Sequence, residues 1–322
     1  MKNKKHLLTF VLAVLLPVSV YAGGEEDLGT SASSFLKIGA GAPTAQALGN
    51  AYVSIAEGSE ALFWNPAGIA GADDKEFQFS YLDWLQGYKA RTLAYVTPMG
   101  GGSVLGITAN YMDLKDFNCT LADGTPCVSD DIYVRNFIGS LSLAHDFYTE
   151  IFKAGVTAKY ITENNDGSHY TNMAFDIGGI VQATDWLSLG LAFQNLGDSK
   201  EVPTVLRLGG GLHSRYLTVS VEMAEYADDE ARYGIGVEVH VPEDIIEFGH
   251  FGLRVGYYTR DSHGLSDNSL VNRLNLADSS KISFGFGLDT GKIFGYGVSI
   301  DYAMTPYGAL GEAHQLGLGI QW

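Results

Sequence analysis

Residues 281–289 (KISFGFGLD) and 294–302 (FGYGVSIDY) decide the fold class of this 322-residue chain. In the first stretch a large apolar residue occupies every second position from Ile282 to Leu288, with serine or glycine between them. In the second, apolar residues from Phe294 to Tyr302 alternate with glycine, serine and aspartate. Successive side chains of a β-strand point to opposite faces. Both stretches therefore predict strands with one apolar face and one small or polar face.

The same alternation recurs from about residue 76 to the end of the chain. Short transmembrane strands of about 9–11 residues, even in number, are typical of bacterial outer-membrane barrels. We therefore expect an all-β fold, a transmembrane antiparallel β-barrel of about 14 strands. The strands are predicted at residues 76–85, 88–97, 102–114, 131–146, 151–163, 170–183, 186–195, 203–213, 216–226, 231–241, 249–260, 281–289, 294–303 and 313–322.

The predicted connections and the aromatic residues favour a membrane barrel over a soluble sandwich. Links after even-numbered strands are short, and those after odd-numbered strands are longer, with 261–280 the longest; the tight first hairpin near Gly87 is an exception. Aromatic residues gather near the predicted strand ends, as they do at membrane interfaces. The last strand ends on Trp322 and resembles the signal that the barrel-assembly machinery recognises, which makes that machinery an expected partner.

Composition excludes several functional classes. Lys and Arg number 20 against 37 Asp and Glu, for a net charge of −17. Such a charge repels phosphate, which argues against nucleic-acid binding and against docking on anionic lipid through a basic patch. Charged residues are only 18% of the chain and glycines number 40, which does not fit disorder or a helical bundle.

The first 22 residues are predicted to be a cleaved signal peptide. Lys2, Lys4 and Lys5 precede an apolar run over 7–20, and small residues stand at Val20 and Ala22 before the expected cleavage. The run is too short for a spanning helix. Removal of the three lysines changes the net charge from −17 to −20. We expect three parts: a signal peptide (1–22), an amino-terminal segment (23–75) and the barrel (76–322), exported to the bacterial outer membrane.

Two cysteines, Cys119 and Cys127, lie in a segment rich in Asp, Gly and Pro. An exported chain meets an oxidising compartment, so a disulfide within one surface loop is the natural interpretation. A metal site is the alternative, but no histidine lies nearby in sequence to complete it. We expect neither a metal nor a cofactor.

Residues 23–75 do not alternate, and they carry a resemblance to a known family. The stretches FLKIGAGAPTAQALGNAYVSIAEG from Phe35 and EALFWNPAGIA from Glu60 resemble the start of PorV/PorQ-family outer-membrane proteins. That family is similar in turn to the FadL-type transporters of hydrophobic compounds. The resemblance covers about 40 residues, and residues 43–46 depart from it, where relatives commonly have an Arg- and Ala-rich stretch.

The resemblance implies that the amino-terminal segment folds into the barrel lumen as a hatch. Small residues would allow close packing against the wall, and Asn65-Pro66 suits a fixed turn. The motif either only shapes the plug or takes part directly in a ligand path. The hatch and ligand-path candidates are Phe35, Leu36, Gly39, Gly41, Gly49, Asn50, Phe63, Trp64, Asn65, Pro66 and Gly68.

Charged residues also fall on the non-apolar face of the predicted strands, where a wet or plugged lumen would accommodate them. They form either a structural network of ion pairs across the lumen or a ladder that guides a solute. These lumen-facing charges are Lys153, Lys159, Arg207, Glu222, Arg232, Glu238, Arg254, Lys281, Asp289 and Asp301.

The sequence contains no G-x-S-x-G, HExxH or Walker A motif, so we expect a protein that is not an enzyme. The resemblance implies an accessory of type IX-like protein secretion, whose partner is the secreted cargo protein. The alternative is FadL-like passive transport of hydrophobic small molecules across the outer membrane. Outer-membrane lipid and lipopolysaccharide are the expected surroundings in both cases.

Overall fold

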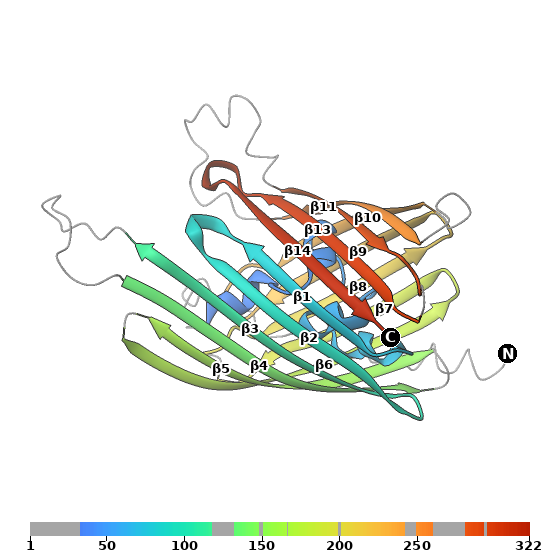
Figure 1. Cartoon of the computed structure of the whole chain (residues 1–322), viewed down its shortest axis with the longest axis horizontal. Helices are drawn as coiled ribbons and strands as arrows, with labels where there is room; N and C mark the ends of the chain where they lie inside the picture. Colours follow the sequence, from blue (N-terminus) through green and yellow to red (C-terminus); the bar gives the residue numbers. More distant parts are fainter. Residues whose placement is uncertain are drawn as a thin grey trace, which may run out of the picture.

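The computed structural model describes residues 33–117, 132–147, 151–165, 167–198, 201–241, 249–259, 281–292 and 295–322. In these ranges fourteen antiparallel strands form one closed barrel, in which each strand pairs with its sequence neighbours and the last strand pairs with the first. The predicted fold class is therefore confirmed (Figure 1). The strands are β1 (Glu76–Asp83), β2 (Lys89–Gly100), β3 (Ser103–Phe117), β4 (Ile132–Phe147), β5 (Phe152–Asn165), β6 (Ser168–Thr184), β7 (Leu187–Leu196), β8 (Val205–His213), β9 (Leu217–Tyr226), β10 (Arg232–Val241), β11 (His250–Tyr258), β12 (Ile282–Asp289), β13 (Gly297–Pro306) and β14 (Glu312–Gln321).

The apolar face of each strand looks outward. On β1, Phe77 and Phe79 are exposed whereas Gln78 and Ser80 are buried, and on β12 Phe284 is exposed while its neighbour is buried. An outward apolar band with polar groups inside is the arrangement that lipid requires of a barrel, since closure leaves no unpaired strand edge. Among the described residues, no helix has both the length and the apolar character needed to cross a membrane.

Predicted strand boundaries differ from the observed ones by a few residues. The largest shift is in β13, which begins at Gly297 rather than 294 and continues to Pro306. The carboxyl-terminal end of β13 stays paired with β14, and this pairing continues as far as Pro306, which lies opposite Glu312. The ladder hydrogen bonds therefore extend the strand past the point where the alternation of side chains stops.

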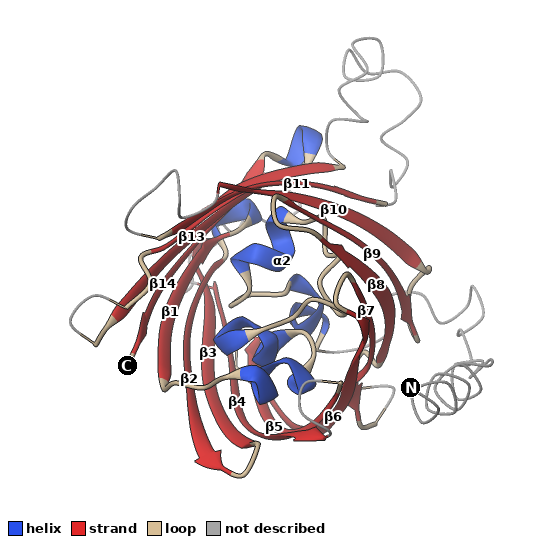
Figure 2. Cartoon of the chain, turned by 90° about the vertical axis from the view of Figure 1, so that its right-hand side faces the viewer, coloured by secondary structure: helices blue, strands red, loops and turns tan. Residues whose placement is uncertain are grey.

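Residues 33–75, here called the inner segment, lie inside the ring of strands, where Figure 2 shows their short helical turns. Helices this short are unstable by themselves, so packing must hold them. Leu48, Val53, Trp64 and Ile69 are almost fully buried between the inner segment and the wall. The helical elements inside the barrel are η2 (Ser34–Ile38), α2 (Pro43–Ala47), η3 (Gly58–Phe63) and η4 (Pro66–Gly71), and those at the strand ends are η5 (Leu85–Gly87) and η6 (Gly308–Leu310).

Glycines of the wall allow the inner segment to come so close. A Cβ built on Gly155 would lie 2.5 Å from the backbone of Pro66, and one on Gly209 would lie 2.6 Å from Val53 Cγ1. Any larger residue there would displace the inner segment. The tiny residues on the non-apolar strand faces therefore mark its contact surface, formed by Gly106, Gly155, Gly178, Gly190, Gly209, Gly234, Gly236, Gly256 and Gly285.

The predicted signal peptide (1–22) and the two cysteines, Cys119 and Cys127, lie outside the described residues. Cleavage of the signal peptide and a disulfide between the two cysteines therefore stay predictions.

Candidate functional site

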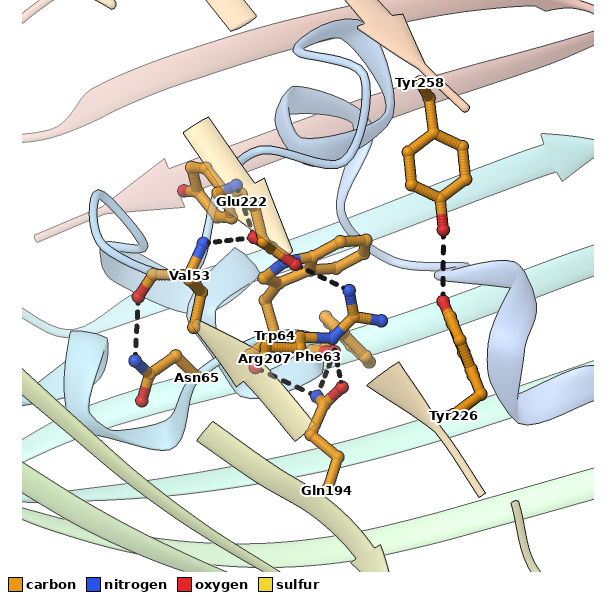
Figure 3. Close-up of polar contacts among 10 residues, drawn as sticks. Val53, Phe63, Trp64, Asn65, Gln194, Arg207, Glu222, Tyr226 and Tyr258 are labelled. Carbon is orange, nitrogen blue, oxygen red and sulfur yellow. Dashed lines mark hydrogen bonds and ion pairs between the residues drawn. The ribbon is translucent and has the colours of Figure 1, made fainter. Parts of the chain in front are cut away.

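Glu222, which points inward from β9, is the main polar anchor of the inner segment (Figure 3). Its carboxylate accepts the backbone N–H groups of Tyr52 and Val53, both at 2.8 Å, and the indole N–H of Trp64 at 3.0 Å. The Glu222 side chain is only 1% exposed. One buried carboxylate on the wall thus satisfies three donors that would otherwise be buried without acceptors.

Arg207 on β8 neutralises this carboxylate and extends the anchor. Its Nη1 donates to Glu222 at 2.7 Å, and its Nε donates to Gln194 Oε1 at 2.6 Å. The guanidinium also lies 4.1 Å from the centre of the Trp64 ring, a cation–π contact. Gln194 in turn donates to the carbonyl groups of Phe63 and Trp64, at 3.1 and 2.9 Å. This buried, hydrogen-bonded charge pair ties residues 52–64 to the wall.

Asn65 ties the next turn to the wall. Its Nδ2 donates to the carbonyl of Val53 at 2.8 Å and reaches the carbonyl of Gly179 on β6 at 3.3 Å. Its Oδ1 accepts the N–H of Ala67, which makes Asn65 the N-cap of η4, with Pro66 in the first turn. Asn65 is fully buried. The turn that the sequence predicts here is observed, and its side chain also bridges two parts of the fold.

The start of the inner segment packs against the wall through apolar contacts at one end of the barrel. Phe35 and Leu36 pack against Ile161, Ala174 and Val202. Phe35 and Ile38 also join a cluster that contains aromatic residues from the β1–β2 and β13–β14 connections: Trp84, Tyr88 and Tyr307. A buried ion pair of 2.7 Å, between Lys37 and Asp228 after β9, fixes η2 at this end.

A cavity of about 850 Å³ lies at the opposite end, where β1 begins and β14 ends. Tyr52, Ile55 and residues 57–60 of the inner segment form part of its wall, and strands complete it. Its ionisable Asp, Glu, Lys and Arg lining consists of the acidic Glu57, Glu60, Glu76, Glu238, Asp289 and Asp301 and of the basic Lys153, Arg215 and Arg254.

Arg254 on β11 organises the carboxylates of this cavity. It donates to Glu238 at 2.8 Å and to Asp301 at 2.6 Å, and so links three strands. Glu60 of the inner segment lies next to this cluster and accepts the N–H of Thr44 at 3.0 Å. Burial, and then the negative charge of Asp301, raise the pKa of Glu60 well above its ordinary value.

The raised pKa of Glu60 predicts a stability that falls as the pH rises. Below the pKa of an unfolded glutamate, about 4.3, both states hold the proton and the contribution of Glu60 is fully present. It is lost as the pH rises through the folded-state pKa, because ionisation is then costly only in the folded protein. Glu60→Gln keeps an acceptor for Thr44 and should unfold at a temperature that depends less on pH. The unfolding temperature can be measured by heat-modifiability on gels from about pH 4 to 8. Glu225→Gln is the control. If Glu60→Gln and the wild type show the same dependence of unfolding temperature on pH, the expectation is wrong.

The predicted ligand-path residues pack against the wall or within the inner segment. Gly39, Gly41 and Gly49 have positive φ angles of 70°, 109° and 60°, and Asn50 has 61°. Gly41 packs against Phe63, and Gly68 against Ala56 and Ala61. Of the eleven candidates, none lines the 850 Å³ cavity in the part of the chain that the structure describes.

Most of the predicted lumen charges form ion pairs. Lys159 pairs with Asp176 at 2.7 Å, and Arg232 pairs with Asp229 in the turn before it. Arg207 with Glu222, and Arg254 with Glu238 and Asp301, were described above. Lys153 and Asp289 line the cavity, and Lys281 stands at the edge of the barrel just before β12.

Sequence reasoning missed three partners that the structure brings in. Asp176 shares the inward parity of Ala174 and Gly178 on β6, so the alternation itself could have identified it. Gln194 also points inward, but a neutral side chain gave no charge signal. Asp229 lies in a turn, where no periodicity applies.

No protein-family model and no curated protein sequence matches this chain. Solved structures of the same architecture do. A deletion mutant of the TodX monoaromatic hydrocarbon channel matches with a TM-score of 0.58 at 11% identity, over 87% of this chain and 97% of that one. A Pseudomonas aeruginosa FadL homologue matches with 0.55 at 11%, over 88% and 98%. The Ralstonia pickettii toluene transporter TbuX matches with 0.53 at 11%, over 87% and 97%. At this identity the shared property is the fold, and this chain has the same barrel fold as these three structures.

Proposed function

We propose that this protein is an outer-membrane channel for passive transport of small hydrophobic molecules, with the inner segment as its hatch. The observation that carries the proposal is a closed fourteen-strand barrel whose lumen holds its own amino-terminal segment, in a fold shared along nearly the whole length of hydrocarbon channels. The outward apolar band and the expected signal peptide support the outer membrane as its location.

A role as an accessory of protein secretion has less support. That role is the one implied by the resemblance to PorV/PorQ. It rests on about 40 residues of the sequence, and none of the matches to known proteins adds to it. The alternative of passive transport therefore becomes the proposal. The neighbours of known fold are transport channels rather than enzymes, in agreement with the absence of catalytic motifs from the sequence.

The two ends of the lumen differ in chemistry. A solute that arrives at the η2 end meets the apolar cluster around Phe35, Trp84 and Tyr307. At the other end it meets the charged cavity. The anchored stretch from Tyr52 to Asn65 separates the two, so passage requires that stretch to move or a path to open beside it.

Toluene uptake tests the proposal. Apolar solutes dissolve in ordinary bilayers, so the assay needs whole Gram-negative cells, in which lipopolysaccharide is the barrier, in a host without FadL-type channels. Cells that make this protein should take up labelled toluene several-fold faster than cells with the empty vector. Equal rates would overturn the transport function.

The hatch role is tested separately in planar bilayers. Deletion of residues 33–72 should leave an inserted, heat-modifiable barrel, because the wall closes by its own hydrogen bonds, and should raise its conductance. Asn65→Ala should raise it less, since it removes side-chain hydrogen bonds and leaves the plug in place. Unchanged conductance after the deletion would exclude a hatch.

A further inference from the structure

We propose that the 850 Å³ cavity acts as a charge filter that favours cations, so that the channel discriminates against solutes that carry a carboxylate. This deepens the transport function proposed above and rests on it. The property concerns the field inside a lumen rather than a coordinated ion, because among the described residues no group of His, Cys, Asp and Glu could hold a metal.

The charges that line the cavity do not balance. Six acidic side chains face it in the described part of the chain, against three Lys and Arg side chains. They come from opposite sides: Glu57 and Glu60 from the inner segment, and the other four from β1, β10, β12 and β13. Acidic side chains therefore outnumber basic ones around the cavity, and they stand both on the inner segment and on the wall.

The positive groups are already engaged with protein. Arg254 spends two of its donors on Glu238 and Asp301. The Lys153 ammonium lies against Gly71, within 2.6 Å of where a Cβ on that residue would be. Arg215 lies over the Tyr216 ring at 5.3 Å. The two ion pairs of Arg254 hold its guanidinium on neighbouring strands and leave it less able to turn toward an anionic solute.

Several carboxylates, in contrast, are presented to the cavity. The Glu57 side chain is exposed there, although Glu57 belongs to a segment inside the barrel. Asp289 accepts hydrogen bonds from the neutral donors of Gly291 at 2.7 Å and Gln321 at 3.1 Å, and it forms no ion pair with another of the described residues. Burial, and after it the negative charge of Asp301, raise the pKa of Glu60, so Glu60 contributes less negative charge to the cavity than its neighbours do.

Two of the histidines that line the cavity lie within hydrogen-bond distance of hydroxyl groups. His213 lies 2.9 Å from Ser188 Oγ, and His240 lies 2.9 Å from Thr218 Oγ1.

The physical consequence is a bias in local concentration. A water-filled cleft lined by one sign of charge, with low-dielectric walls, raises the concentration of counter-ions and their encounter rates by about 10- to 1000-fold, and charged rings select ions in pores in the same way. Neutral aromatic compounds and amines would therefore pass, and carboxylates would be disfavoured.

A cysteine probe measures this field without requiring transport. Ser299 lines the cavity opposite Asp289, so Ser299→Cys in a Cys119→Ser/Cys127→Ser background places one thiol there. The thiol is treated with a cationic reagent, trimethylammonium-ethyl methanethiosulfonate, and with its anionic counterpart, the sulfonatoethyl compound. Relative to free 2-mercaptoethanol, we expect the cationic reagent to be favoured by about tenfold. Ser59→Cys repeats the measurement from the inner segment if the first variant does not fold.

Neutralising the acids should remove the preference. Glu57→Gln and Asp289→Asn should each lower the rate ratio, whereas Glu225→Gln, on the outward face of β9, should leave it unchanged. A ratio equal to that of the free thiol, a preference for the anionic reagent, or no reaction with either reagent in folded barrels would overturn the charge filter. If toluene uptake fails while the ratio stands, the transport function is wrong and the cavity field is right.

Discussion

Glu222→Ala is expected to release the inner segment from the wall while the barrel stays inserted. The substitution leaves the donors of Tyr52, Val53 and Trp64 without their acceptor, and the buried Arg207 without its counter-charge. Breaking a buried ion pair from one side costs about 3–5 kcal/mol. No bond of the strand ladder depends on this carboxylate, so the loss falls on the docking of the inner segment.

The measurement is limited proteolysis of the inner segment in detergent, together with bilayer conductance. A cost of this size corresponds to cleavage faster by about a hundredfold or more if cleavage requires release, and to larger and noisier currents. Glu225→Ala is the matched control, since it removes the same group from the outward face of the same strand. Removal of both charges, as in Arg207→Met/Glu222→Leu, should cost less than Glu222→Ala alone. Cleavage of Glu222→Ala at the wild-type rate would show that the anchor contributes little.

Gly178→Val is expected to displace the turn at Asn65 with nearly as large an effect. A Cβ at this position would collide with Asn65 Oδ1 and lie 2.9 Å from Pro66 Cδ. Overpacking of this kind costs about 1–3 kcal/mol, or more where the backbone must move. Valine suits a strand better than glycine does, so the barrel itself should assemble.

The neighbouring glycine supplies the control. Gly179 faces outward, and a Cβ there would meet Phe152 Cε2 at 3.7 Å, an ordinary contact. Gly179→Val should therefore leave protease resistance and conductance unchanged, while Gly178→Val raises both the cleavage rate and the conductance. Equal behaviour of the two variants would mean that the wall does not position the inner segment.

The barrel could be predicted from the sequence because its determinant is local. Each strand must show one face to lipid and one to the lumen, and this requirement repeats every two residues, as from Ile282 to Leu288. The alternation along each strand also predicts which charged residues face the lumen. In the structure Arg207, Glu222 and Arg254 point inward. The turn at Asn65-Pro66 was predictable for the same reason, since a cap needs only the residues beside it.

The anchor and the cavity were decided by tertiary structure alone. Glu222 meets Tyr52 across 170 positions of the chain, and Asn65 meets Gly179 across 114. No period in the sequence reports such a pairing, because the curvature of the closed sheet and the path of the inner segment determine it. Gly178 and Gly179 are the same residue in the sequence. They differ in the atoms that a Cβ would meet within 4 Å, which belong to the inner segment at Gly178 and to the neighbouring strand at Gly179. Alternation thus fixed the wall, whereas the contents of the lumen depended on contacts that form only when the wall has closed.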